Sequence, residues 1–281
     1  GRPLTRYTVF TDAGGRAIAM DVHTHHILLD GASTAIIEAD LARYLSAPDQ
    51  SPCSTRAFAA LAAAHRTEAT KVAESTERFG TAIHRELTER ARLGEVGQMD
   101  GEVHIGTAAR GVRGETVRVD GSGYREIIEL AERRGVPLNI LVGAAALAVH
   151  AGLRQSTSCL LVHPVDNRFG ESRLEVATCL VNSVAQQVSF APFAAVGDVV
   201  TDLDRGYVKA ARRRWFREER YRRMYLAVNQ GAYAEALTVN FLRGRCAPEL
   251  DRYLSGPPVV TDIGPVEGMT VACTLDEARQ S

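Results

Sequence analysis

Paired cysteines are absent from this sequence of 281 residues, although five cysteines occur. They are widely separated and odd in number, and none forms a Cys-x-x-Cys pair, which argues against a disulfide framework and a zinc knuckle. A reducing compartment suits such a chain, so we expect a cytoplasmic protein. The five are Cys53, Cys159, Cys179, Cys246 and Cys273.

Neither sign of charge is in excess, because 33 Lys and Arg residues nearly balance 34 Asp and Glu residues, for a net charge of -1. No bulk field then favours nucleic acid or an anionic membrane, and we expect neither as a partner. One stretch, residues 211–223, holds seven arginines and two glutamates. We interpret it as a solvated helix face, with docking of an acidic carrier protein as the alternative and nucleic-acid binding third.

A long uninterrupted apolar run is also missing. The longest apolar stretch, residues 136–153, contains Pro137, Asn139 and His150, and it falls short of the roughly 20 apolar residues of a membrane helix. We expect a buried core helix there. The chain as a whole is 45% hydrophobic, which is ample for a buried core.

Short β-rich segments and longer amphipathic segments interleave without a strict βαβ rhythm, which predicts α/β layers with a mixed sheet. The expected strands cover residues 5–12, 15–26, 101–108, 115–121, 158–165, 179–190 and 236–242. The expected helices cover 34–46 with Ser33 as N-cap, two helices between 55 and 92, 123–134 ended by Gly135, a buried helix opened by Pro137, and 193–225.

Three histidines stand within four positions of the segment "MDVHTHHILLDGAS", residues 20–33: His23, His25 and His26. On an alternating strand, His26 shares a face with Ile18, Met20 and Val22. A buried imidazole there would stay unprotonated near neutral pH and could take a proton from an amine or alcohol. The alternatives are core histidines without chemistry, or chelation of a divalent ion by His23 and His25, for which no third ligand is indicated.

Asp30 and Gly31 follow the histidines within the same segment. A carboxylate in apolar surroundings needs a basic partner, which must come from elsewhere in the chain. Gly31 would turn the chain and let its backbone approach a substrate or the next helix closely.

The segment His25-His26-Ile27-Leu28-Leu29-Asp30-Gly31 matches the HHxxxDG motif. The chain thereby resembles the condensation domains of nonribosomal peptide synthetases, within the chloramphenicol acetyltransferase-like superfamily. Three later segments strengthen the resemblance in the right order: residues 134–153, the segment "CLLVHPVDNR" at 159–168, and "CLVNSVAQQV" at 179–188. The segment "LTVNFL" at 237–242 also has a counterpart in the family.

The resemblance implies an α/β fold of the chloramphenicol acetyltransferase type, with two similar mixed-sheet subdomains arranged in a V. Residues 1–110 would be the remainder of an N-terminal subdomain carrying the motif, and residues 111–281 a C-terminal subdomain. Because family domains are longer, we expect a partial domain that either exposes an unusually large apolar patch beside His26 or covers it with another chain. The sequence departs from the family pattern at Leu180 and Ser183, and it lacks a Tyr-Trp pair before the crossover.

The resemblance also assigns roles to residues. His26 would be the catalytic histidine, acting as a general base or positioning the amine, and Asp30 would be structural and paired with Arg168. We therefore expect a catalytic segment of His25, His26, Asp30 and Gly31, supported by Arg168 and Asn182. No cofactor or metal would bind directly, because donor and acceptor carrier proteins would present the phosphopantetheine thioester.

The implied function is transfer of an acyl or peptidyl thioester to an amine, which forms an amide in nonribosomal peptide biosynthesis. One alternative is ester formation on a hydroxyl by the same fold. Another is a non-catalytic platform that recruits a partner enzyme, although such domains usually carry a broken histidine motif.

Overall fold

The computed structural model describes residues 3–47, 54–93, 114–229, 236–243, 250, 253–255 and 268–275. The chain divides into two compact units that interleave along the sequence. Unit 1 comprises Gly1–Glu68, Asp166–Val181 and Cys246–Ser255, and unit 2 comprises Ala69–Val165, Asn182–Arg245 and Gly256–Ser281. The subdomain boundary expected at residue 110 falls outside the described residues and stays a prediction.

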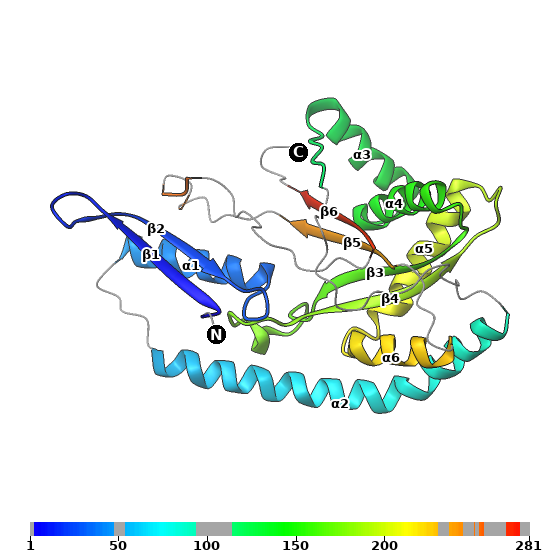
Figure 1. Ribbon diagram of the computed structural model, residues 1–281, viewed down its shortest axis with the longest axis horizontal. Coiled ribbons are helices and arrows are strands. Elements are labelled where there is room, and N and C mark those ends of the chain that lie inside the picture. The colour runs from blue at the N-terminus through cyan, green and yellow to red at the C-terminus, as the bar shows by residue number, and fades with distance from the viewer. Residues whose placement is uncertain are drawn as a thin grey trace. The chain divides into compact units, whose positions relative to one another are not determined.

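The described strands and helices interleave in groups without a strict βαβ rhythm, as the sequence predicts (Figure 1). Strands are β1 (Thr5–Thr11), β2 (Ala17–Thr24), β3 (Ser158–Asp166), β4 (Val181–Ser189), β5 (Ala236–Arg243) and β6 (Met269–Leu275). Helices are α1 (Gly31–Ser46), α2 (Ser54–Arg92), α3 (Gly121–Arg134), α4 (Leu138–Arg154), α5 (Val196–Ala211) and α6 (Glu218–Val228), with a 3-10 turn at Ser172–Leu174.

In unit 1, β1 and β2 form the predicted antiparallel hairpin, with Tyr7 opposite Val22 and Val9 opposite Met20. The alternation of β2 gives it the predicted apolar face. That face is exposed, since Ile18, Met20 and Val22 keep 66%, 53% and 48% of their surface accessible. Apolar side chains on this strand are therefore exposed, as expected. That they are exposed because the domain is partial stays a prediction.

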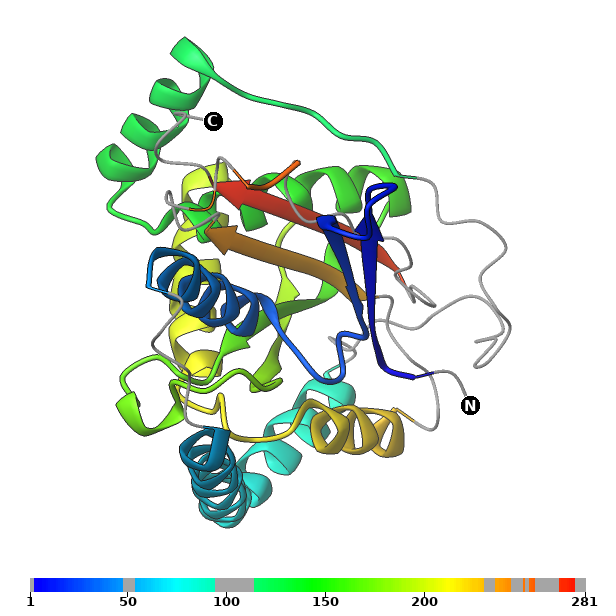
Figure 2. The same cartoon turned by 90° about the vertical axis from the view of Figure 1, so that its left-hand side faces the viewer.

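Unit 2 is built on a four-stranded sheet with the order β4-β3-β5-β6, in which β3 pairs with β5 and β5 with β6 in parallel. Both faces of β3 are covered. Figure 2 shows α4 on one side of this sheet and α6 with the second half of α2 on the other.

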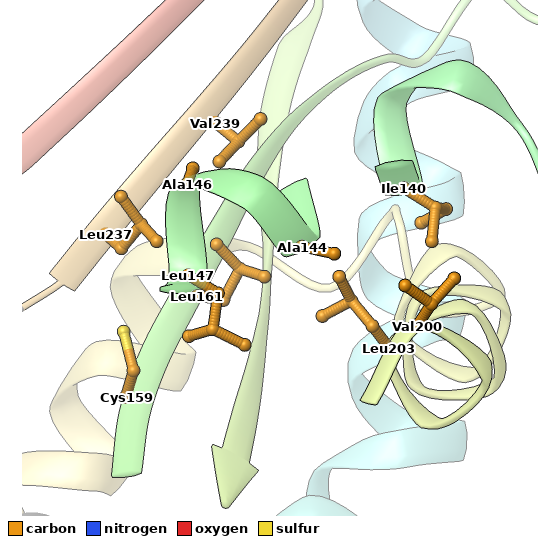
Figure 3. Close-up of a cluster of buried hydrophobic side chains, with 10 residues drawn as sticks. All are labelled: Ile140, Ala144, Ala146, Leu147, Cys159, Leu161, Val200, Leu203, Leu237 and Val239. Carbon is orange, nitrogen blue, oxygen red and sulfur yellow. The ribbon is translucent and has the colours of Figure 1, made fainter. Parts of the chain in front are cut away.

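Alternate side chains of β3 enter two separate cores, which accounts for its nearly continuous apolar sequence. Leu160 and Val162 pack with Ile83 and Leu87 of α2. On the other face, Leu161 packs with residues of α4, α5 and β5 (Figure 3). That second core consists of Ile140, Ala144, Ala146, Leu147, Cys159, Leu161, Val200, Leu203, Leu237 and Val239.

Several predicted elements are wrong in extent. The two helices expected between 55 and 92 form one helix, α2, because this Ala-, Glu- and Arg-rich stretch contains no proline and its Gly80 does not interrupt it. Residues 115–120 belong to no strand, and the helix expected at 193–225 is broken between α5 and α6. Strand β6 was not expected, and the strand expected at 101–108 lies outside the described residues.

The other helix boundaries follow local signals. Helix α3 ends as predicted at Gly135, whose left-handed backbone (φ 63°) is the conformation that glycine adopts most readily. Pro137 immediately precedes α4, whose buried residues include Ile140, Leu147 and His150. Among the described residues no single helix is long and apolar enough to cross a membrane; α3 and α4 reach that length and composition only as a pair bent by 102°.

A buried polar group links β3, β4 and α5 within unit 2. His163 is 2% exposed, its Nε2 lies 3.3 Å from Nε2 of Gln186, and its ring meets Tyr207 edge-on at 4.9 Å between centroids. Burial lowers the pKa of His163 to about 4, so the imidazole is neutral and its Nε2 accepts from the Gln186 amide. Gly206 faces the same amide closely enough that an added Cβ would overlap Oε1 of Gln186.

Gly206→Ala should therefore destabilise the protein by about 1–3 kcal/mol, because its methyl group must displace the buried Gln186 side chain. Gly152→Ala in α4 is the matched control, since no atom lies within 4 Å of its added Cβ. It should be neutral or stabilise by up to about 1 kcal/mol. Urea denaturation of both variants measures the difference, and equal midpoints would contradict the close contact at Gly206.

Candidate active site

The histidine pair lies in a turn rather than on the strand. Strand β2 ends at Thr24, and the N–H of Leu28 then donates to the carbonyl of His25 over 3.0 Å. The His25 side chain stays within this turn, since its Nδ1 accepts from the N–H of Ile27 over 3.1 Å. His26 is exposed, so the expectation that it lies on a buried apolar strand face is wrong.

Asp30, and not Ser33 as predicted, is the N-cap of α1. Its Oδ1 accepts from the Ser33 N–H over 2.9 Å and from the Ser33 hydroxyl over 2.7 Å, while the Ser33 Oγ accepts from the Asp30 N–H over 3.3 Å. The two residues thus form a reciprocal capping box. Gly31 is the first residue of α1 and is exposed, so the turn occurs earlier in the chain than expected.

The basic partner that Asp30 requires is Arg168, as the resemblance implies. Arg168 Nη1 donates to Asp30 Oδ2 over 2.8 Å, and both side chains are buried, at 7% and 5% exposed. Arg168 Nη2 donates to Ser33 Oγ over 3.1 Å, to the carbonyl of Val176 over 3.0 Å and to the carbonyl of Thr178. The guanidinium thereby joins the start of α1 to the segment that precedes β4.

The second oxygen of Asp30 reaches the same segment directly. Oδ2 accepts from the N–H groups of Leu180, over 2.7 Å, and Val181, over 3.1 Å. Burial of the carboxyl raises the pKa of Asp30, but the hydrogen bonds from Arg168, Leu180 and Ser33 outweigh it, and the net pKa is lowered. Asp30 is therefore an ionised structural anion, and the turn that carries His26 precedes it by only a few residues.

Asn182 is buried at 6% exposed and holds the connection between α5 and α6. Its Nδ2 donates to the carbonyls of Arg214 (2.7 Å) and Phe216 (2.9 Å), and its Oδ1 accepts from the N–H of Glu218 over 3.3 Å. These bonds stabilise the break in the helix expected at 193–225. Support of the catalytic segment by Asn182 stays a prediction.

Asp30, Ser33, Arg168 and the N–H groups of Leu180 and Val181 together form the Asp30 cluster. The side chains of Thr178 and His65 lie beside it, which the sequence did not indicate. Thr178, whose carbonyl accepts from Arg168 and lies 2.7 Å from the Ser33 Oγ, presents its Oγ1 to Nε2 of His65 over 3.4 Å. His65 and Glu68 are three residues apart on α2, a spacing that could have drawn attention to them, but nothing in the sequence indicates that Thr178 meets them. In the described part of the chain, no group of three or more His, Cys, Asp or Glu residues could hold a metal ion.

Comparison with solved structures identifies the fold. The first condensation domain of the calcium-dependent antibiotic synthetase superposes with a TM-score of 0.59 at 18% identity, over 96% of this chain and 61% of that one. The X-domain from teicoplanin biosynthesis, in its complex with OxyB, superposes with a TM-score of 0.61 at 14% identity. The match covers 98% of this chain and 62% of that one. The chain therefore has the mixed α/β fold of nonribosomal peptide synthetase condensation domains, which confirms the predicted fold class.

At the level of sequence, the chain is similar to part of two isonitrile lipopeptide synthases. It is 57% identical over 286 residues to the protein from Mycobacterium marinum and 56% identical over 283 residues to that from Mycobacterium tuberculosis. All of this chain is aligned, but it spans only 20% and 11% of those proteins' lengths. No protein-family profile matches the chain.

Replacing either partner of the buried ion pair should be strongly destabilising, because the remaining charge is left buried and unpaired. We expect Asp30→Ala and Arg168→Ala each to cost about 3–5 kcal/mol of unfolding free energy. The double variant should cost less than their sum by about 0.5–3 kcal/mol. Denaturant titration of the four proteins measures this coupling.

The control for this cycle is the exposed pair Glu129 and Arg133 on α3, whose coupling should stay below about 1 kcal/mol. If the losses of unfolding free energy in the Asp30 and Arg168 variants are strictly additive, the two side chains have no interaction energy with each other.

The lowered pKa of Asp30 predicts a dependence of stability on pH. In the unfolded chain this carboxyl titrates near its ordinary value of 3.8, whereas the folded state keeps it ionised to lower pH. The contribution of Asp30 to the free energy of unfolding is therefore fully present at pH values above 3.8. It is lost as the pH falls through the pKa of the folded state. The stability difference between wild type and Asp30→Asn should be constant from pH about 7 to 5 and shrink below about 4. A difference that grows on acidification would contradict the lowered pKa.

Proposed function

We propose that this chain is a condensation-type acyltransferase that joins a carrier-bound acyl or peptidyl thioester to an amine. The observation that carries the proposal is the combination of a buried, fully engaged Asp30 with an exposed His26 four residues earlier. The cluster around Asp30 fixes the start of α1, while the turn before it leaves an imidazole accessible to reactants. The synthase names of both relatives and the condensation-domain fold support an enzyme of this class.

The proposed reaction forms a C–N bond and breaks the thioester C–S bond. His26 accepts the proton of the attacking amine, or holds the amine in position, and the departing thiolate leaves protonated as the phosphopantetheine thiol. Because a thioester is already activated, positioning of two bound reactants can supply up to about 7–11 kcal/mol of the rate enhancement. The histidine adds an acid–base contribution of typically about 10²–10⁴-fold.

The proposed partners follow from this chemistry. Donor and acceptor carrier proteins deliver the phosphopantetheine arms, so the chain itself binds no cofactor in this scheme. The cytoplasm, where carrier-bound thioesters are made, is the proposed location. An amide product agrees with the lipopeptide named for both relatives, since acylation of an amine is the step that joins a lipid to a peptide.

His26→Ala should lower product formation by about 10²–10⁴-fold while leaving the melting temperature unchanged, because this side chain is exposed. A single-turnover assay of the native polypeptide, with an acyl-loaded carrier protein and an amine acceptor, measures the loss. His23→Ala, also exposed and located on β2, is the control and should retain full turnover. Undiminished turnover of the His26 variant would overturn the assignment.

The same assay separates the alternatives by product. A hydroxyl acceptor consumed in preference to the amine would identify ester formation. The likeness to an X-domain bound to OxyB favours the platform as a second candidate. Absence of product with either acceptor, together with a stable complex with a partner enzyme, would support that role.

A further inference from the structure

Three side chains of unit 1 form a hydrogen-bonded series that the proposed condensation reaction does not use. Glu68 Oε2 lies 3.3 Å from His65 Nδ1, and the opposite ring nitrogen, Nε2, lies 3.4 Å from Thr178 Oγ1. The series therefore consists of a carboxylate, an imidazole and a hydroxyl in that order. This is the arrangement in which an acidic group orients a base and the base activates a nucleophile.

The first two members are held by helix geometry. His65 and Glu68 are three residues apart on α2, so their side chains lie on one face of the helix. The Glu68 side chain is 10% exposed and that of His65 is 50% exposed, which leaves the imidazole accessible. A carboxylate can only accept, so Nδ1 carries the proton and the Nε2 lone pair is directed to the Thr178 hydroxyl.

The third member is fixed through its backbone. The Thr178 carbonyl accepts from Arg168 and lies 2.7 Å from the Ser33 Oγ, so the residue is anchored beside Asp30 while its hydroxyl points to His65. The neighbouring Cys179 is a weaker competitor. Burial raises the pKa of the Cys179 thiol, and the charge of Asp30 raises it further, which keeps the thiol protonated.

We propose that Thr178 is an acyl-acceptor site, activated by His65 and oriented by Glu68, that takes an acyl group from an activated ester or thioester. Thr178 Oγ attacks the acyl carbonyl as its proton passes to His65 Nε2. The new C–O bond forms, the C–S bond of a thioester breaks, and His65 returns the proton to the departing thiolate. The product is an ester on Thr178. Only the identification of a thioester as the natural donor rests on the proposed function.

The test uses p-nitrophenyl acetate, a donor that needs no carrier protein, with the intact native polypeptide. Acetylation is followed by mass spectrometry of the tryptic peptide that begins at Leu174, after treatment with neutral hydroxylamine to remove thioesters and retain oxyesters. We expect an acetyl group on Thr178. Thr178→Val should abolish it, whereas Thr178→Ser, which keeps a hydroxyl, should retain it.

The base and its orienting group are tested by His65→Gln and Glu68→Gln, which should slow the acetylation of Thr178, by about 10²-fold for His65. Ser172→Ala is the matched control, because this exposed hydroxyl six residues earlier lies outside the series, and its rate should be unchanged. Acetylation that disappears with hydroxylamine and is therefore confined to Cys179, a rate unaffected by His65→Gln, or no adduct at all would each overturn the proposal.

A parallel measurement separates this proposal from the condensation function. Thr178 should still be acetylated in His26→Ala, whose turnover with a loaded carrier is expected to be lost. Labelling of Thr178 with normal turnover in that variant would refute the condensation assignment alone, and lost turnover without labelling would refute the acyl-acceptor site alone.

Discussion

The buried ion pair between Asp30 and Arg168 is the contact on which the organisation of the candidate site depends. Removing two charges from water costs several kcal/mol for each ion, and their mutual attraction compensates only when the remaining hydrogen-bonding groups are also engaged. Asp30 meets this condition through five donated hydrogen bonds, which come from Ser33, Arg168, Leu180 and Val181. The pair consequently acts as a fixed joint between segments distant in sequence, rather than as a source of net stability by itself.

The elements that local patterns specify were predicted well from the sequence. The β1–β2 hairpin, the buried helix after Pro137 and the end of α3 at Gly135 follow from alternation, apolar periodicity and glycine capping. One error occurs where a side chain distant in sequence contacts the segment concerned. At the break between α5 and α6, the Asn182 amide binds carbonyls 32 and 34 residues away, and no local pattern indicates these contacts.

In the candidate site, too, contacts between residues distant in sequence could not be predicted from local patterns. Asp30 and Ser33 are both common N-cap residues, so composition alone could not establish which of them caps α1. The partnership of Asp30 with Arg168 came from the family resemblance and not from spacing. The contact of Thr178 with His65 spans 113 residues and could be found only in the structure.

The sequence separation within the Asp30 cluster also sets an order of events during synthesis. Asp30 is bonded to residues 138 to 151 positions later in the chain, so the histidine segment leaves the ribosome long before its supports exist. At typical elongation rates of about 5–20 residues per second, the delay is roughly 7–30 s. Through that interval the nascent segment carries an aspartate without its arginine and an exposed apolar hairpin. The histidine segment is thus synthesised well before the residues that hold it in place, whatever else the chain folds in the meantime.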